Sequence, residues 1–298
     1  MEKRVLGKTG MAVTVLGFGA AEIGYENVPF DTVKRLLHSA LDAGLNVIDT
    51  AECYPGSEEM IGRALSGRRQ DFLLFTKCGH ASGFDLPDWH PRMLEMQIDR
   101  SLERLRVDHL DLVQLHSCSR AVLENGDAIR VIQKARDAGK TRFIGYSGDG
   151  DDAVCAIETG AFDTLQTSVS IADLQAIELT LPLAVRRNMG VIAKRPIANA
   201  VWRTGTKPAN AYHHEYWRRI ELLQYEFLRG GLDRSISIAL RFTLAQPGVA
   251  TAIVGTTNPD RWARNARLLE PGALTSAEIQ RIRDRWRAVA SPDWVGQI

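Results

Sequence analysis

The sequence predicts a closed barrel of eight parallel β-strands surrounded by helices, the (β/α)8 TIM-barrel class of α/β fold. Short apolar runs typical of buried parallel strands alternate with amphipathic helical segments along the chain. Eight such runs can be counted, and several of the helical segments end at a glycine, as helices commonly do. No obvious linker interrupts the alternation, so we expect a single domain over residues 1–298.

The expected strands are short and rich in Val, Ile, Leu and Phe. They cover residues 13–19, 46–51, 72–78, 110–117, 141–148, 164–170, 190–198 and 251–256. Segments with helical periodicity follow them, for example residues 31–44, 57–65, 91–105 and 128–139. A doubly wound parallel sheet shows the same alternation, but the count of eight and the absence of a linker favour the barrel.

Four segments depart from the repeat. Residues 4–13 contain a Lys-Thr-Gly turn between two short apolar pieces, which predicts a β-hairpin that closes the floor of the barrel. Residues 79–90 and 199–231 are insertions after the third and seventh strands, so we expect both to overhang the carboxyl end of the barrel. Residues 276–289 predict an extra C-terminal helix.

The charge balance excludes a general attraction to polyanions. The 298 residues include 37 basic and 36 acidic side chains, for a net charge of +1. We therefore expect a small-molecule partner and no nucleic-acid partner. The N-terminal residues lack the apolar core of a signal peptide, and no apolar stretch has the length of a membrane span, which predicts a cytoplasmic protein without a membrane partner. A monomer is the default expectation, with an oligomer left open.

The four cysteines, Cys53, Cys78, Cys118 and Cys155, are dispersed and form no CxxC pair. This spacing matches neither a disulfide scaffold nor a zinc site, so we expect reduced thiols and no bound metal. Cys78 follows Lys77 on a strand and should point away from any pocket that Lys77 faces.

Three short segments resemble nucleotide or metal motifs but fail at a required position. Residues 17–24 have Glu22 where a dinucleotide fingerprint needs a glycine. Residues 138–141 resemble the end of a phosphate loop, but the first glycine of that loop would fall at position 134, which is Lys134. Residues 213–218 have Arg218 where a zinc protease helix needs its second histidine. Rossmann binding, ATP hydrolysis and zinc proteolysis are therefore not favoured.

Four polar residues stand at or just past the ends of separate apolar runs: Asp49, Tyr54, Lys77 and His116. In a barrel of parallel strands such ends converge on one face, so a carboxylate, a phenol, an amine and an imidazole would meet in one pocket. Each residue taken alone also fits a structural role. Together they suit proton delivery to a carbonyl group.

The segments that carry these residues are LNVIDTAECYPGSEEMIGRAL, FTK and LERLRVDHLDLVQLH, and GKTRFIGYSG follows them. In this order they resemble the aldo-keto reductase family, and the likeness extends from KRVLGKTG through GTTNPDRWARN. The resemblance implies a barrel oxidoreductase that reduces aldehydes or ketones to alcohols with a nicotinamide dinucleotide.

Physical chemistry assigns the same roles to the four residues. Hydride addition builds negative charge on the carbonyl oxygen, which a proton from Tyr54 would relieve. The Lys77 ammonium would lower the pKa of the phenol toward neutrality, and Asp49 would keep Lys77 charged. His116 would hydrogen-bond the substrate oxygen and orient the carbonyl, with its protonation state left open.

The resemblance also implies residues that bind the nucleotide, with NADPH preferred and NADH possible. Asp49, Ser147 and Gln166 would lie at the nicotinamide. The residues expected at the seventh strand end are Lys194, Arg195, Pro196, Ile197 and Asn199, and those expected at the adenosine end are Gly255, Thr256, Thr257, Arg261 and Asn265. Arg261 would bind the 2′-phosphate that distinguishes NADPH from NADH.

Three positions depart from the family pattern. The usual Ser-Asn pair is Ser147-Gly148, so we expect weaker nucleotide binding that depends on Gln166 and Ser147. The lysine that begins the adenosine segment in many members is Gly255, which predicts a less extreme NADPH preference. Lys194 falls near the tyrosine that many members stack on the nicotinamide. A cation there would disfavour the oxidised, positively charged ring; alternatively, Lys194 and Arg195 turn toward the pyrophosphate.

The substrate is the part of the site that the sequence specifies least. Trp89 and Trp202 in the insertions and Glu22 after the first strand are expected to contact it, and aromatic walls suit aryl or medium aliphatic carbonyl compounds. Two other functions stay open. One is a nucleotide-binding regulatory or redox-sensing subunit with little turnover, and the other is a barrel lyase or isomerase that uses Lys77 as a Schiff base.

Overall fold

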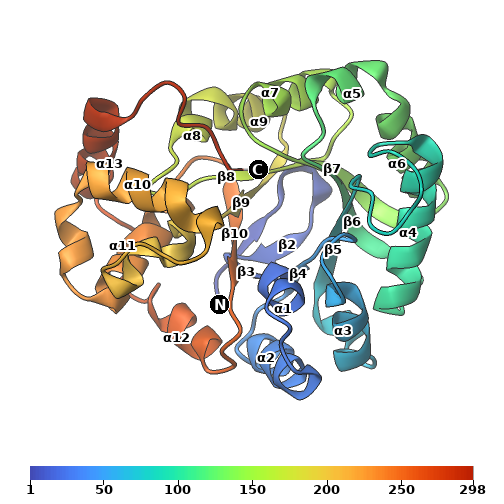
Figure 1. Ribbon diagram of the computed structural model, residues 1–298, viewed down its shortest axis with the longest axis horizontal. Helices are drawn as coiled ribbons and strands as arrows, with labels where there is room; N and C mark the ends of the chain where they lie inside the picture. Colours follow the sequence, from blue (N-terminus) through green and yellow to red (C-terminus); the bar gives the residue numbers. More distant parts are fainter. Residues whose placement is uncertain (298) are drawn as a thin grey trace.

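The computed structural model describes residues 1–297 and contains a closed barrel of eight parallel strands (Figure 1). The barrel strands are β3 (Leu16–Gly19), β4 (Val47–Asp49), β5 (Leu73–Cys78), β6 (Leu110–His116), β7 (Thr141–Ser147), β8 (Thr164–Ser168), β9 (Gly190–Lys194) and β10 (Val249–Gly255). They follow one another around the barrel in chain order, and β10 pairs with β3 to close it. The predicted fold class is therefore confirmed.

Helices surround the strands. They are α1 (Ala21–Tyr25), α2 (Phe30–Asp42), α3 (Ser57–Ala64), α4 (Pro91–Leu105), α5 (Arg120–Asn125), α6 (Asp127–Asp137), α7 (Gly150–Thr159), α8 (Gln175–Leu179), α9 (Leu181–Arg186), α10 (His214–Leu223), α11 (Leu232–Leu244), α12 (Arg261–Arg267) and α13 (Ser276–Val289). Local sequence accounts for several ends. Thr275 and Glu278 form a capping box at the start of α13, and α7 ends at Gly160 in the left-handed conformation.

The floor of the barrel is a hairpin of β1 (Lys3–Val5) and β2 (Ala12–Thr14), joined by a 3-10 turn at Gly7–Thr9. The expected strand 13–19 is therefore wrong, because it is two elements. Val13 and Thr14 pair with β1, and the barrel strand begins only at Leu16. Buried Leu6, Met11 and Val13 close the lower end of the barrel.

A second correction concerns the seventh strand, expected over residues 190–198. It ends at Lys194, because Arg195 has a φ of 54° and turns the chain out of the sheet. The next residues form the 3-10 segment η3 (Ala198–Thr204), where Ala198, Asn199 and Ala200 also have positive φ. A run of non-glycine residues in this region stores strain, which native structures tend to retain at functional sites.

The interior of the barrel changes from apolar to polar along the strands. Val47, Phe75 and Leu112 fill the lower part together with the hairpin. Because side chains alternate in a strand, the residues two positions later, Asp49, Lys77 and Gln114, face the same interior nearer the carboxyl end. Cys78 belongs instead to the core between strands and helices, so it points away from the interior as expected.

The two insertions and the chain end lie beyond the carboxyl ends of the strands. Residues 79–90 connect β5 to α4, and residues 199–231 contain the 3-10 turns η4 (Ala211–His213) and η5 (Glu226–Arg229) as well as α10. After α13 the chain returns toward the strands, as the red segment in Figure 1 shows. Within residues 1–297 we find no helix with the length and hydropathy of a membrane span.

Candidate active site

Asp49, Tyr54, Lys77 and His116 come together at the carboxyl end of the barrel. Asp49 and His116 are the last residues of β4 and β6, Lys77 is the penultimate residue of β5, and Tyr54 lies in the turn that leads to α3. The backbone N–H of Tyr54 donates to the Ala51 carbonyl, 3.0 Å away, which holds that turn. Four separate segments thus contribute to one site.

Lys77 and Asp49 form a buried ion pair at the base of this site. Lys77 Nζ lies 2.6 Å from Asp49 Oδ2 and 2.8 Å from the Thr50 carbonyl oxygen, and both side chains are at most 5% exposed. Gln114 Nε2 donates to the other carboxylate oxygen of Asp49 at 3.3 Å. The pair compensates two charges that would otherwise be costly to bury.

The Tyr54 ring lies next to this pair, with Lys77 Nζ 5.4 Å from the ring centroid. The pKa of Tyr54 is raised well above 10, chiefly by burial and then by the Asp49 carboxylate. The expectation that Lys77 lowers this pKa toward neutrality is therefore wrong. Asp49 neutralises much of the ammonium charge, so Tyr54 stays a protonated phenol and can donate a proton to a stronger base such as an alkoxide.

His116 is held neutral beside Tyr54. The two ring centroids are 5.9 Å apart in an edge-to-face arrangement. Burial lowers the pKa of His116 well below 6.5, and the charge of Lys77 adds to the effect. His116 Nδ1 lies 3.6 Å from Cys53 Sγ, a contact whose direction depends on the tautomer. A neutral imidazole can orient an oxygen without competing with the phenol as an acid.

The residues expected to hold the nicotinamide carboxamide line one side of the interior. Ser147 and Gln166 are paired across β7 and β8 and are 1% exposed. The Gln166 side-chain oxygen is buried and has no hydrogen-bond partner among the described residues. An unpaired buried acceptor at this position fits the amino group of a carboxamide.

The packing around Gly148 explains why this chain lacks the asparagine of the family pattern. A β-carbon on residue 148 would lie 2.5–2.7 Å from the ring end of Tyr146, whose hydroxyl donates to the Cys118 carbonyl at 2.8 Å. A side chain at position 148 would therefore displace a buried tyrosine. The remaining amide and hydroxyl, on Gln166 and Ser147, are the groups that could hold a carboxamide.

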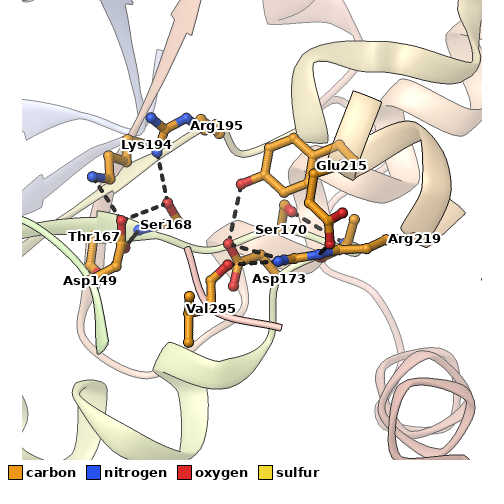
Figure 2. Close-up of polar contacts among 12 residues, drawn as sticks. Asp149, Thr167, Ser168, Ser170, Asp173, Lys194, Arg195, Glu215, Arg219 and Val295 are labelled. Atoms are coloured by element: carbon orange, nitrogen blue, oxygen red, sulfur yellow. Dashed lines mark hydrogen bonds and ion pairs between the residues drawn. The ribbon is translucent and has the colours of Figure 1, made fainter. Parts of the chain in front are cut away.

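Lys194 has a partner that the sequence interpretation did not consider. Its Nζ lies 2.9 Å from Asp149 Oδ2, and Asp149 also accepts from Thr167 Oγ1 at 2.8 Å and the Ser168 backbone N–H at 2.6 Å. Figure 2 shows Lys194 and Arg195 on the same side of Asp149 and Ser168. Pairing cancels most of the Lys194 charge, which weakens both earlier expectations for this residue.

Two side-chain hydroxyl groups hold the Arg195 guanidinium. Its Nη1 donates to Ser168 Oγ at 3.0 Å, and its Nε donates to the Tyr212 hydroxyl at 2.7 Å. Asn199 Nδ2 lies 3.2 Å from His213 Nδ1, so this contact joins two parts of the second insertion. Pro196 accepts from Thr243 Oγ1 through its carbonyl, and Ile197 packs against the core. Arg195 is the cation of this segment without a carboxylate partner among residues 1–297.

The expected adenosine residues follow β10. Thr256 Oγ1 accepts from the Asn258 N–H at 3.2 Å, and Arg261 begins α12, with buried Asn265 one turn later. Arg264 on the same helix is paired with Asp233 at 2.7 Å, whereas Arg261 has no carboxylate partner within the described residues. Thr257 lies in the same loop, half-buried. These positions could hold an anionic group.

The three expected substrate contacts lie in different surroundings. Trp89 packs edge-to-face on His80, whose ring centroid is 5.0 Å from that of His116, so Trp89 lies close to the four central residues. The Trp202 indole donates to Ser235 Oγ at 2.9 Å and so fixes the second insertion to α11. Glu22 lies against Gly255, on the adenosine side of the site.

Three residues of this site were missed in the sequence. Gln114 could have been noticed as a polar residue within the apolar run 110–116, two positions before His116. His80 lies in an insertion without periodicity, and Asp149 lies at a helix start, where a carboxylate is common, so neither carries a distinctive local signal. Among residues 1–297, no group of three or more metal-ligating side chains is present.

Comparisons with known proteins identify the family. The sequence profile of the aldo/keto reductase family matches residues 15–287. The chain belongs to this family. L-Galactose dehydrogenase from Arabidopsis thaliana is 27% identical, with 100% of this chain and 99% of the plant protein covered. NADH-specific methylglyoxal reductase from Escherichia coli is 25% identical, with 97% and 99% covered.

Solved structures agree with this assignment. The holo form of aldo-keto reductase AKR11C1 from Bacillus halodurans superposes on this aldo-keto reductase with a TM-score of 0.85 at 27% identity. The superposition covers 98% of this chain and 99% of that chain. The chain is therefore an oxidoreductase-family barrel along its whole length.

Proposed function

We propose that this aldo-keto reductase reduces aldehydes or ketones to alcohols with a reduced nicotinamide dinucleotide, NADPH in preference to NADH. The observation that carries the proposal is the buried Lys77–Asp49 pair beneath a protonated Tyr54 and a neutral His116. A cytoplasmic location and a small carbonyl substrate are part of the proposal. The similarity to oxidoreductases along the whole chain supports the reaction class.

The chain would hold the nucleotide through two groups of residues. Gln166 and Ser147 offer a carboxamide an acceptor and a hydroxyl, and Arg261 offers a guanidinium to a phosphate. When bound, the reduced nicotinamide would supply the hydride. Within residues 1–297 the Gln166 side-chain oxygen has no hydrogen-bond partner and Arg261 has no carboxylate partner, and both features fit such a ligand.

The four central residues would handle the proton and the carbonyl oxygen. His116 would orient the oxygen, because its neutral ring can donate one hydrogen bond without adding charge. Tyr54 would then pass its hydroxyl proton to that oxygen as negative charge develops. The Lys77–Asp49 pair would position the phenol beside the substrate oxygen.

Substitution of Tyr54 by phenylalanine tests this function. The purified protein would be titrated with NADPH and NADH, and turnover of 4-nitrobenzaldehyde followed by loss of the reduced-nicotinamide absorbance. We expect Tyr54→Phe to lower kcat by about 10²–10⁴-fold while nucleotide binding persists, because only the proton donor is removed. Tyr225→Phe is the matched control, because the Tyr225 hydroxyl donates to the Ile171 and Ile282 carbonyls and not to the central group.

The outcomes separate the alternatives. Turnover that Tyr54→Phe leaves intact would contradict Tyr54 as the acid. Tight nucleotide binding without turnover across an aldehyde panel would favour the regulatory or redox-sensing subunit. Borohydride trapping of a substrate on Lys77 without nucleotide would favour a Schiff-base lyase or isomerase.

A further inference from the structure

A carboxylate lies directly on the last residue of β10. The Glu22 side chain occupies the space that a β-carbon on residue 255 would need, since an ideal β-carbon there lies 1.8 Å from Glu22 Oε2 and 2.4 Å from Oε1. Any residue other than glycine at position 255 would displace the Glu22 carboxylate. Glu22 and Gly255 are therefore a complementary pair.

This carboxylate is half-buried and has no ion-pair partner within residues 1–297. A backbone hydrogen bond at Glu22 favours the charged form of the carboxylate, and the like charge of Glu26 disfavours it. Burial raises the pKa of Glu22. A half-buried carboxylate without an ion-pair partner is stabilised further by a ligand that donates a hydrogen bond to it.

The position of the pair identifies the chemistry of that ligand. Glu22 belongs to α1, directly after β3, and Gly255 directly precedes Thr256 and Thr257, so both lie at the carboxyl end of the barrel. Ribose hydroxyls can donate to a carboxylate, whereas a phosphate is repelled by it. Relative to the family pattern, Gly255 removes a lysine, and Glu22 puts a negative charge in the same place.

We propose that Glu22 is a specificity-determining residue that restrains the preference for NADPH, by favouring ribose hydroxyls and repelling the 2′-phosphate. This inference rests on the proposed nicotinamide-dependent function. It makes Glu22 part of nucleotide selection rather than a substrate contact, and it assigns to Gly255 the role of admitting the carboxylate.

The test compares dissociation constants for NADPH and NADH, measured by fluorescence titration, in the wild type, Glu22→Gln and Glu26→Gln. Glu26 is an exposed glutamate at the end of the same helix, so its substitution removes a charge without touching Gly255. We expect Glu22→Gln to raise the ratio of NADPH to NADH affinity by roughly three- to tenfold, and Glu26→Gln to change it less than about twofold. The Glu22→Gln effect should shrink in 1 M salt, where screening acts over about 3 Å.

A second variant distinguishes a change in nucleotide selection from a folding defect in Glu22→Gln. Glu22→Ala combined with Gly255→Lys places a cation where the carboxylate lies, and it should raise the ratio further than Glu22→Gln. An unchanged ratio in Glu22→Gln, or an equal change in Glu26→Gln, would overturn the role of Glu22 while the reductase function stands. Failure of the wild type to bind either nucleotide would overturn both.

Discussion

At the scale of single residues, the site depends on how burial shifts the protonation of neighbouring groups. His116 is surrounded by basic side chains from several elements: Lys77, His80, Lys194 and Arg195. Their charges and the burial of the ring act in the same direction, so the imidazole stays neutral. Tyr54 stays protonated for the same main reason, namely the loss of water around it.

The neutral state of His116 predicts a pH dependence of stability. The pKa of His116 in the folded protein lies below its ordinary value of 6.5, so the unfolded chain binds the extra proton first as the pH falls. The free energy of unfolding should therefore decrease below pH 6.5, by up to about 1.4 kcal/mol per pH unit until the folded pKa is reached. Melting temperatures of the wild type and His116→Gln between pH 8 and pH 5 measure this.

The comparison with the variant isolates His116 from other titrating groups. Burial raises the pKa of Glu58 and of Asp173 to about 7, which opposes the effect of His116 as the pH falls. Both carboxyls are present in both proteins. We expect the wild type to lose more stability than His116→Gln on acidification, and parallel curves would show that His116 is not held neutral.

At the scale of elements, the first insertion places the Trp89 ring near the candidate site, and the ring packs closely against the backbone of Gly79. Gly79 has a φ of 141°, and a β-carbon there would lie 1.7 Å from the Trp89 ring. The backbone N–H of Trp89 donates to the Gly79 carbonyl at 2.9 Å, and the indole ring packs on His80. Gly79 therefore leaves room for the Trp89 ring next to His80, whose own ring contacts His116.

Gly79→Ala should destabilise the protein and change substrate recognition together. The backbone strain and the displaced indole should cost about 2 kcal/mol of unfolding free energy, and KM for an aryl aldehyde should rise. Gly83→Ala is the matched control in the same insertion, because Gly83 also has positive φ but no atom lies within 4 Å of an added β-carbon. It should cost about 1 kcal/mol without a change in KM. Equal effects on KM would contradict a role for Trp89 in the site.

At the scale of the whole molecule, the chain end connects the outer helices to the candidate site. Trp294 is 2% exposed and packs between Trp286 on α13 and the guanidinium of Arg219 on α10. Arg219 Nη2 donates to the Val295 carbonyl at 2.7 Å, a contact drawn in Figure 2. Gly296 then lies on Asp149, because a β-carbon there would be 2.2 Å from the carboxyl carbon. The tail, residues 291–297, thus covers the partner of Lys194.

Trp294→Ala should release the tail without unfolding the barrel. The tail contributes no strand to the barrel, so the free energy of unfolding should fall by less than about 2 kcal/mol, while hydrogen exchange in the tail accelerates at least about tenfold. Urea unfolding would measure the first consequence, and hydrogen exchange followed by mass spectrometry would measure the second. Val295→Ala, at a side chain that is 42% exposed, is the control. Unchanged tail exchange in Trp294→Ala would show that the indole is not the anchor.

The features that local sequence specified are those with a short-range physical cause. The alternation of strands and helices follows from apolar periodicity, and the convergence of Asp49, Lys77 and His116 follows from parallel strands that end at one face. The hairpin was also predicted, although its second strand was merged with β3. An apolar run does not show where one strand stops and the next begins, and that boundary is set by pairing with β1.

Other features arose only when distant segments were packed together. The Lys194–Asp149 pair joins residues 45 positions apart, and Glu22 meets Gly255 across the point where the barrel closes. The pKa of Tyr54 is raised by burial and by Asp49, whereas the sequence interpretation had Lys77 lower it and Asp49 act only on Lys77. Periodicity reports which face of an element is apolar, but charge compensation and desolvation depend on three-dimensional neighbours.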